Sequence, residues 1–386
     1  MTRIEQDRPG ARKVPSHAYY GIQTLLAAEK LPVAGIPVHE EWIAALANVK
    51  QAAAQAHVDL GTLPLTIGRC VIKAAEEIRT GKHLQEFILD GIQAGIHDAL
   101  NTNMNEVIAN RALEFMLEGK GSYEIIHPEK HVNLSQNAHG LMSVSFRIAA
   151  HSLSQELIRS TDRLISCLLD YEKTMDKLHS PSSPAPTPGT IPWLGRQFGN
   201  SARNLLRDMK EMVKASSRLQ TVDLSDALIS NEPSGEAEFI KTAAAYLTKQ
   251  TKLDILTKNN VMDSHGSHEA PLDLSTAVLN CALVISKIGS DARLAAAVLS
   301  QDDTTDQALS IRAISESAAM LAQIAFQAAG LNHSIRLAAE FGMADQDGMP
   351  SLMALNLLES MKLLIKGMES FTLMLKMDAE QRILYR

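Results

Sequence analysis

The chain has 386 residues, of which 45% are hydrophobic and 4% aromatic, and its net charge is −7. So many apolar residues exclude a disordered chain, and the mild acidity without a clustered Lys/Arg stripe argues against binding to nucleic acid. Few aromatics beside abundant Ala, Leu and Met favour packed helices over a β-sandwich.

The first forty residues are predicted to be irregular, because prolines and glycines recur throughout them. Residues 1–7 are charged and lack an apolar core, so we expect no signal peptide. Three helices follow, each ended by a glycine just beyond its last turn: residues 40–60, 64–80 and 103–118.

No glycine or proline occurs between Gly140 and Pro181, and apolar residues recur there at steps of three, four or seven. This pattern predicts one bundle helix about 60 Å long, at about 1.5 Å per residue. A helix of that length needs long neighbours to cover its apolar face. Four further segments carry helical periodicity and are predicted to supply them: residues 201–221, 272–299, 304–329 and 351–376.

The Pro-rich segment 181–192 connects the first two long helices. Its prolines disfavour helix and predict an extended, stiff crossover loop, which we prefer to a docking motif for an aromatic groove. The predicted fold is therefore all-α, with a small N-terminal helical domain over residues 1–135 and a long-helix bundle over residues 136–386.

The most apolar stretch, residues 272–288, contains Asp273, Asn280 and Lys287 and is predicted to be a buried bundle helix rather than a membrane span. Three cysteines are scattered along the chain without a C-x-x-C pair: Cys70, Cys167 and Cys281. They predict reduced thiols, and we expect a cytoplasmic protein that contacts no membrane.

Three blocks follow one another along the chain: residues 10–25 (GARKVPSHAYYGIQTL), 103–112 (NMNEVIANRA) and 127–136 (HPEKHVNLSQ). In order and spacing they resemble the aspartase/fumarase superfamily, and most closely aspartate ammonia-lyases and class II fumarate hydratases. The resemblance continues more weakly at residues 287–294 and 338–342 and so covers most of the chain. The family's small C-terminal domain after the bundle is expected to be missing.

The resemblance implies an activity and an assembly. Enzymes of this family remove ammonia or water across the Cα–Cβ bond of a dicarboxylate, without a cofactor. A base takes the weakly acidic Cβ proton, while hydroxyl, amide and ammonium donors hold both carboxylates and the developing charge. Family sites draw on three subunits, so the resemblance implies a tetramer that binds a small dicarboxylate-like substrate.

The segments that match the family's substrate loops have changed. Where the family has Gly-Thr-Ser, this chain has His97-Asp98-Ala99, so both hydroxyl donors are lost and an acid is gained; Asn101 matches the next family asparagine. The family's Gln-Ser-Ser/Thr-Asn-Asp becomes residues 136–140 (QNAHG). Its Thr-His or Thr-Gln pair falls at Pro184-Ala185, and its Gly-Thr-Gly turn becomes residues 230–235 (SNEPSG).

The largest change concerns the family's mobile loop G-S-S-x-M-P-x-K-x-N-P, whose serine is the base. Residues 300–307 (SQDDTTDQ) are shorter and do not contain that loop. The alignment places Asp306 or Gln307 at the base and Arg312 at the lysine. Asp302, Asp303 and Asp306 resemble an N-terminal helix cap more than a metal cluster.

Two histidines appear in these changed segments, and three interpretations stay open. In the first, His139 and His97 replace the serine base, Asp98 orients one of them, and substrate is held by Asn101, Gln136, Asn137 and Arg312. In the second, His97, Asp98 and His139 bind a metal with His265 or His268, although we expect none. In the third, the histidines serve no catalytic purpose.

Residues retained from the family are predicted to be structural. Asn103, Asn105 and Glu106 are predicted to open a helix, where such side chains cap it or complement its dipole. His131 and Asn133 are predicted to hold the scaffold, with a secondary anion site formed together with His127 and Lys130 as the alternative.

Two functional hypotheses follow. The chain is either a diverged lyase for an amino- or hydroxy-dicarboxylate or a modified relative, or a non-catalytic subunit that stabilises or regulates an active homologue. It is accordingly expected as a homotetramer or as a mixed tetramer with that homologue. Fold class alone does not decide between them.

Overall fold

The computed structural model describes residues 1–7, 10–30, 34–178, 190–229, 233–256, 269–298, 306–341 and 349–384. Helices dominate these residues, which confirms the all-α prediction. The chain divides into two compact units, which are residues 1–152, 218–269 and 337–355, and residues 153–217, 270–336 and 356–386. The sequence-based domain boundary after residue 135 stays a prediction.

The beginning of the chain is more ordered than predicted. Strands β1 (Thr2–Asp7) and β2 (Gly10–Pro15) pair antiparallel, and α1 (Ile22–Lys30) follows. The Arg3 guanidinium donates to the carbonyl oxygens of Pro15 at 2.9 Å and Tyr20 at 2.7 Å. The prediction of an irregular segment was wrong because a short hairpin tolerates glycine and proline at its ends: Gly10 opens β2 and Pro15 closes it.

The first unit contains the three predicted shorter helices: α2 (Glu40–Asp59), α3 (Leu65–Arg79) and α4 (Ala99–Phe115). Gly61 and Gly81 have φ angles of 71° and 89°, the left-handed conformation expected of a glycine that follows a helix.

Helix α4 begins four residues earlier than predicted, at Ala99 rather than residue 103. Asn103, Asn105 and Glu106 therefore lie inside the helix and do not cap it. All three are at least 97% buried. The Glu106 carboxylate accepts hydrogen bonds from the backbone of Gly21, Gln23 and Thr24 at 2.8, 2.9 and 3.1 Å. The prediction of a structural role agrees with this geometry, but the mechanism is a clamp on α1.

Gly21 has to be a glycine for this clamp to form. A β-carbon at residue 21 would lie 2.7 Å from the Glu106 carboxylate and 2.5 Å from the Tyr123 hydroxyl oxygen. Both distances are shorter than any van der Waals contact, so a side chain would separate α1 from α4.

Short elements complete the first unit. They are the 3-10 helices η1 (Leu84–Glu86) and η2 (Gln93–Asp98), the π-helix η3 (Pro128–Val132), the strands β3 (Thr221–Asp223) and β4 (Asp254–Leu256), and α7 (Pro233–Thr251). Strands β3 and β4 pair in parallel. Helix α7 was not predicted, and it packs on α2 through a stacked contact between Phe239 and His57, with ring centroids 4.1 Å apart.

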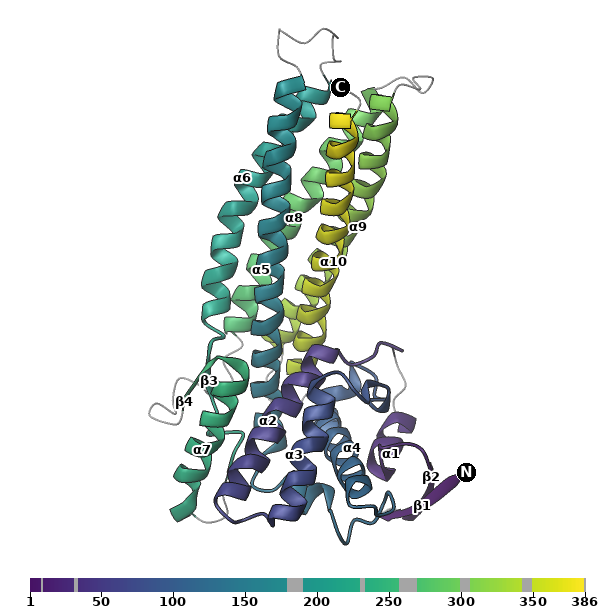
Figure 1. Cartoon of the computed structure of the whole chain (residues 1–386), viewed down its shortest axis with the longest axis vertical. Coiled ribbons are helices and arrows are strands. Elements are labelled where there is room, and N and C mark those ends of the chain that lie inside the picture. The colour runs from purple at the N-terminus through teal and green to yellow at the C-terminus, as the bar shows by residue number, and fades with distance from the viewer. Residues whose placement is uncertain are drawn as a thin grey trace. The chain divides into compact units, whose positions relative to one another are not determined.

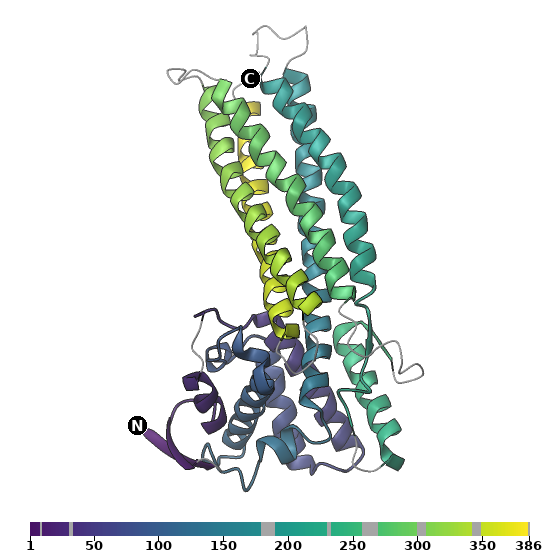
Figure 2. The ribbon, with the colours of Figure 1, turned by 180° about the vertical axis from the view of Figure 1, so that it is seen from behind.

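The second unit contains the long helices, which run side by side in Figures 1 and 2. They are α5 (Ala138–Leu178), α6 (Thr190–Ser217), α8 (Glu269–Val298), α9 (Asp306–Phe341) and α10 (Met349–Leu384). The start of α5, the first residue of α8, the end of α9 and the start of α10 belong to the first unit. The predicted helices 201–221, 272–299, 304–329 and 351–376 each fall largely within one of them. Residues 179–189, most of the Pro-rich segment, lie outside the described residues.

The prediction that residues 181–192 are not helical was wrong for the last three of them, because α6 already begins at Thr190. Pro192 lies in the first turn of that helix. A proline is tolerated there, since the backbone N–H that it lacks would have no partner within the helix.

The bundle core follows the predicted apolar periodicity. In α10 the predicted stripe is fully buried: Leu357, Met361, Leu364, Met368, Phe371 and Leu375. Small residues let two helices approach closely, since a β-carbon at Gly289 of α8 would lie 2.5 Å from the carbonyl oxygen of Ala318 in α9. Close-packed seams of this kind explain why the long helices need one another.

Among the described residues, one helix is long and apolar enough to cross a membrane, residues 269–297, and half of its most apolar window is buried. A core helix of a bundle passes the same test of length and composition, so this is weak evidence for a span.

Replacing Glu106 should destabilise the protein. Glu106→Ala leaves three backbone N–H groups and the Thr24 hydroxyl without their acceptor. Hydrogen bonds to charged groups contribute about 1.5–3 kcal/mol each, so we expect a loss of about 3 kcal/mol or more in urea unfolding. Glu106→Gln, which keeps one acceptor oxygen, should lose less, and exposed Glu118→Ala should stay within about 0.5 kcal/mol of the original protein. Equal effects of Glu106→Ala and Glu118→Ala would contradict the clamp.

Candidate functional site

Six of the seven predicted site residues lie in the first unit, around two helix starts. His97, Asp98 and Asn101 lie where η2 runs into α4, and Gln136 and Asn137 immediately precede α5. His139 is the second residue of α5. The seventh, Arg312, is half-buried on α9 and belongs to the second unit.

The start of α4 has an unusual backbone. Asp98 occupies the residue before the helix with φ 55°, a left-handed conformation that aspartate tolerates better than most residues, and its side chain does not cap the helix. His97 belongs to η2, but its side chain lies outside the described residues. Left-handed residues other than glycine cost about 1–3 kcal/mol and cluster at functional sites, which favours a role for this turn.

Asn101 is 2% exposed, and its amide nitrogen Nδ2 donates to Asn133 Oδ1 at 3.3 Å. Its own carbonyl oxygen is buried and has no hydrogen-bond partner among the described residues. A buried acceptor in this state is costly unless water or a ligand donates to it. Asn101 is thus the predicted substrate-binding residue with the clearest unused hydrogen-bonding capacity.

The second helix start is held by backbone pairing. Ser135 has φ 55°, Asn137 N–H donates to the Ala227 carbonyl at 2.9 Å, and Gln136 forms an isolated bridge with Leu228. The Gln136 amide nitrogen donates to the Val132 carbonyl at 2.9 Å, and its Oε1 is buried without a partner within the described ranges.

Asn137 caps helix α5. Its Oδ1 accepts from the backbone N–H of His139 at 3.2 Å, the typical geometry of an asparagine at a helix N-terminus. The amide nitrogen of Asn137 and the second lone pair of its oxygen remain for a substrate. The imidazole of His139 is half-buried beside this cap.

The glycine at residue 140 reflects a close backbone contact. A β-carbon there would lie 2.3 Å from the Asp226 carbonyl oxygen and 2.6 Å from the Ala227 nitrogen. The family pattern has an aspartate at this position, and no side chain fits here while the segment around Asp226 stays in place. The local packing therefore requires the glycine that replaces the family's aspartate.

The structure adds one residue that the sequence did not single out. Lys50, in the middle of α2, is fully buried, and its Nζ donates to Asn133 Oδ1 at 2.7 Å. Burial lowers the pKa of Lys50 to about 7, against the opposing influence of Glu129. The sequence did offer one indication of this burial, because Lys50 lies on the apolar face of its helix, four residues from Leu46.

The retained residues of η3 are held by internal hydrogen bonds. His131 Nδ1 accepts from the His127 N–H at 2.9 Å, and Asn133 Nδ2 donates to Glu129 Oε2 at 3.0 Å. These contacts favour the scaffold prediction for His131 and Asn133 over the anion site. Burial also lowers the pKa of His131, together with the nearby His127 and Lys130.

Several predicted elements lie outside the described residues: Pro184-Ala185, residues 230–232, His265, His268 and residues 299–305. Within the described ranges, no group of three or more His, Cys, Asp or Glu side chains is placed to hold a metal ion. The metal interpretation also involves His97, His265 and His268, whose side chains lie outside the described residues. It therefore stays a hypothesis.

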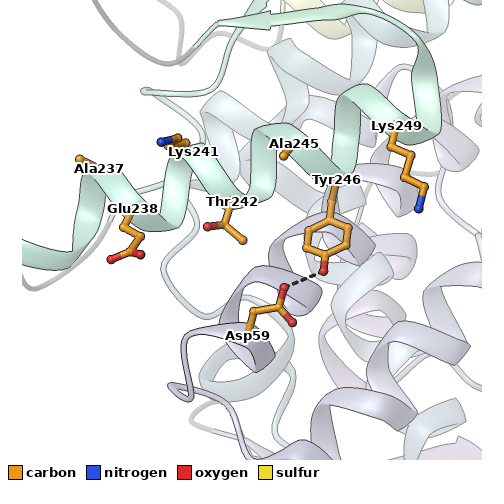
Figure 3. A pocket seen from close by; sticks show the side chains of 8 residues that line it. All are labelled: Asp59, Ala237, Glu238, Lys241, Thr242, Ala245, Tyr246 and Lys249. Carbon is orange, nitrogen blue, oxygen red and sulfur yellow. Dashed lines mark hydrogen bonds between the residues drawn. The ribbon is translucent and has the colours of Figure 1, made fainter.

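A surface hollow of about 770 Å³ lies elsewhere in the first unit, along α7. Figure 3 shows Tyr246 pointing across it to Asp59, and its hydroxyl donates to the carboxylate at 2.6 Å. Lys241 and Lys249 extend from the same helix. None of the predicted site residues lines this hollow, so it is separate from the candidate site.

Comparison with known proteins places these segments in a family. A family model described as lyase matches residues 10–298. Aspartate ammonia-lyase of Bacillus subtilis (strain 168) is 32% identical over 380 residues, which cover 96% of this chain and 80% of the relative. Class II fumarate hydratase of Nitrosomonas europaea is 28% identical, with 96% and 82% covered. The crystal structure of fumarate lyase:delta crystallin from Brucella melitensis superimposes with a TM-score of 0.82 at 27% identity, over 96% of this chain and 87% of that one.

Low pH should destabilise the segment that precedes α5. His57 is 4% exposed, and its Nε2 lies 3.0 Å from the Leu134 carbonyl, just before Gln136. Burial lowers the pKa of His57 below its ordinary value of about 6.5. As the pH falls, His57 is therefore protonated in the unfolded chain before it is protonated in the folded protein. The free energy of unfolding that neutral His57 contributes is fully present above about pH 6.5, and it is lost as the pH falls toward the lower pKa of the folded state.

The thermal midpoint measured from pH 8 to pH 5 should accordingly fall less steeply in His57→Gln than in the original protein. Exposed His333→Gln, on α9, is the matched control and should retain the original pH dependence. An unchanged slope in His57→Gln would show that other groups carry the acid sensitivity.

Proposed function

Since the chain belongs to the aspartase/fumarase superfamily of lyases, we propose that it is a diverged lyase acting on an amino- or hydroxy-dicarboxylate or a modified relative. In this proposal the ordinary elimination with a serine base is lost, and a histidine takes the place of the base. The observation that carries it is the half-buried imidazole of His139 at the start of α5, in the segment that matches a substrate loop of the family.

The proposed chemistry uses imidazole in two protonation states. A neutral His139 ring takes a proton from the substrate carbon, and a protonated ring holds a carboxylate. His97 is proposed as its partner and Asp98, half-buried at the start of α4, as the group that orients one of the two rings. Asn101, Gln136, Asn137 and Arg312 are proposed to bind the substrate.

The second candidate function is a non-catalytic subunit of a mixed tetramer. It is favoured by apolar side chains on the bundle that are each more than half exposed: Leu283, Leu294, Phe326, Leu373 and Met377. Such residues on several long helices favour association through the bundle, either with further copies of this chain or with a homologue. We propose a tetramer in both cases.

The purified chain should form no fumarate from L-aspartate or L-malate above background. The serine loop, the hydroxyl pair at His97-Asp98-Ala99 and the pair at Pro184-Ala185 are all replaced. Each lost donor at such a site costs about 2.7–4 kcal/mol of transition-state stabilisation, so little activity should remain. Aspartate ammonia-lyase of Bacillus subtilis serves as the positive control in the same assay.

The proposed assembly has its own test, since light scattering of the purified chain should give the mass of a tetramer.

Turnover of either substrate at ordinary enzyme rates would contradict the loss of the serine-based reaction. Mixing with an intact homologue separates the two functions. An increase in the homologue's activity or stability on mixing would favour the subunit hypothesis over the lyase.

A substitution at His139 tests the lyase itself. A panel of amino- and hydroxy-dicarboxylates and their substituted relatives should contain a substrate whose elimination His139→Asn abolishes, because asparagine has about the size of the imidazole but does not exchange protons near neutral pH. The thermal midpoint and the mass of the assembly should stay nearly unchanged. His333→Asn, at an exposed position of α9, should retain full activity. Full activity in His139→Asn would identify His139 as a bystander.

A further inference from the structure

Lys50 is an unusual residue to find inside α2. It is fully buried, and its described hydrogen bond joins Nζ to a neutral amide, Asn133 Oδ1, at 2.7 Å. Moving an ammonium group out of water is expensive unless it is paired with an acid at close range. The fold therefore carries a cost at Lys50 that an apolar residue would avoid.

Lys50 helps to fix the orientation of the Asn133 side-chain amide. Its Oδ1 accepts from both Lys50 Nζ at 2.7 Å and Asn101 Nδ2 at 3.3 Å, and its Nδ2 donates to Glu129 Oε2 at 3.0 Å. A flipped amide would point its N–H groups at two other donors and its oxygen at a carboxylate. The charged groups on both sides thus fix the Asn133 amide in one direction.

The orientation of Asn133 determines that of Asn101. Because Oδ1 of Asn133 offers an acceptor, Asn101 has to turn its Nδ2 toward it, and the Asn101 carbonyl oxygen is left on the other side of the amide. That oxygen is buried, and within the described part of the chain it has no hydrogen-bond partner, while the whole residue is 2% exposed.

Asn105 repeats the arrangement one turn further along α4. Its Nδ2 donates to Glu129 Oε1 at 3.1 Å, and its own oxygen is also buried without a partner in the described ranges. Residues four apart share one face of a helix, so the same Glu129–Asn133 pair orients both amides. Two buried acceptors on one face indicate a place for a group that brings hydrogen-bond donors.

We propose that Lys50 is a positioning residue that acts through Asn133 to hold the Asn101 carbonyl oxygen ready for the amino or hydroxyl group of a bound substrate. This inference rests on the proposed lyase function and deepens it, because it names the part of the substrate that is recognised. A dicarboxylate with an N–H or O–H donor satisfies the buried oxygen, whereas succinate, which lacks that donor, leaves it unsatisfied.

Binding measurements test the proposed recognition. By titration calorimetry, the original protein should bind L-aspartate or L-malate at least about 10-fold more tightly than succinate, because a site built to hydrogen-bond a donor rejects an analogue without it. In Lys50→Met the preference should fall to within about twofold, with the affinity for succinate retained. Exposed Lys241→Met, on α7, is the matched control and should keep the full preference.

Two variants keep the test decisive where Lys50→Met does not fold. Asn133→Ala removes the relay itself, and Asn101→Leu removes the acceptor while leaving Lys50 and Asn133 in contact. Both should lose the preference for donor-bearing ligands. A full preference retained in Lys50→Met or Asn133→Ala, or equal affinities of the original protein for all three ligands, would overturn the proposal.

A second measurement needs no ligand and separates this proposal from the proposed function. Lys50→Met and Asn101→Leu should shift the unfolding midpoint non-additively, because both side chains bond to the same oxygen of Asn133. Lys241→Met combined with Asn101→Leu should be additive. Additive effects in the first pair would overturn the Lys50 proposal whatever binds. A folded protein that converts no member of the dicarboxylate panel would instead overturn the proposed function.

Discussion

Inside the first unit, the carboxylate of Glu106 lies away from water and gathers three backbone N–H groups and one hydroxyl group from residues 21–24. Burial raises the pKa of Glu106, and these hydrogen bonds oppose the rise by favouring the ionised form. The clamp fixes α4 against the start of the chain. Asn101 and Asn105 project from the same helix, so the clamp helps to hold them in place.

Residues that hold the backbone in place match the family pattern, whereas several of the segments that align with its substrate loops differ from it. Glu106, Asn103 and Asn105 bond to other segments of the fold, so changing any of them breaks packing. The replaced positions, at His97 to Ala99 and at Ala138 to Gly140, lie at helix starts. One fold can therefore carry different sites.

How far the sequence predicted this structure depends on how local each feature is. The long helices follow from apolar periodicity and from the lack of glycine and proline in residues 141–180, which are local properties. The clamp on Glu106 depends on contacts between distant segments, and so it was assigned to a cap. The β1–β2 hairpin was missed because its glycines and prolines were interpreted as signs of irregular structure. At the candidate site, the sequence singled out both segments, but it placed the start of α4 at residue 103 rather than Ala99. It also could not show that Asn137 caps α5 through its side-chain oxygen.

Lys50 shows the same limit and also bears on function. A lysine on the apolar face of a helix commonly extends its ammonium group to water, so its place four residues from Leu46 and Ala54 did not predict complete burial. An apolar residue of similar volume at such a position is often neutral or stabilising. A subunit with no substrate to bind gains nothing from a buried lysine that orients an asparagine acceptor. The buried group therefore favours the lyase over the purely structural subunit, for a reason independent of the histidines.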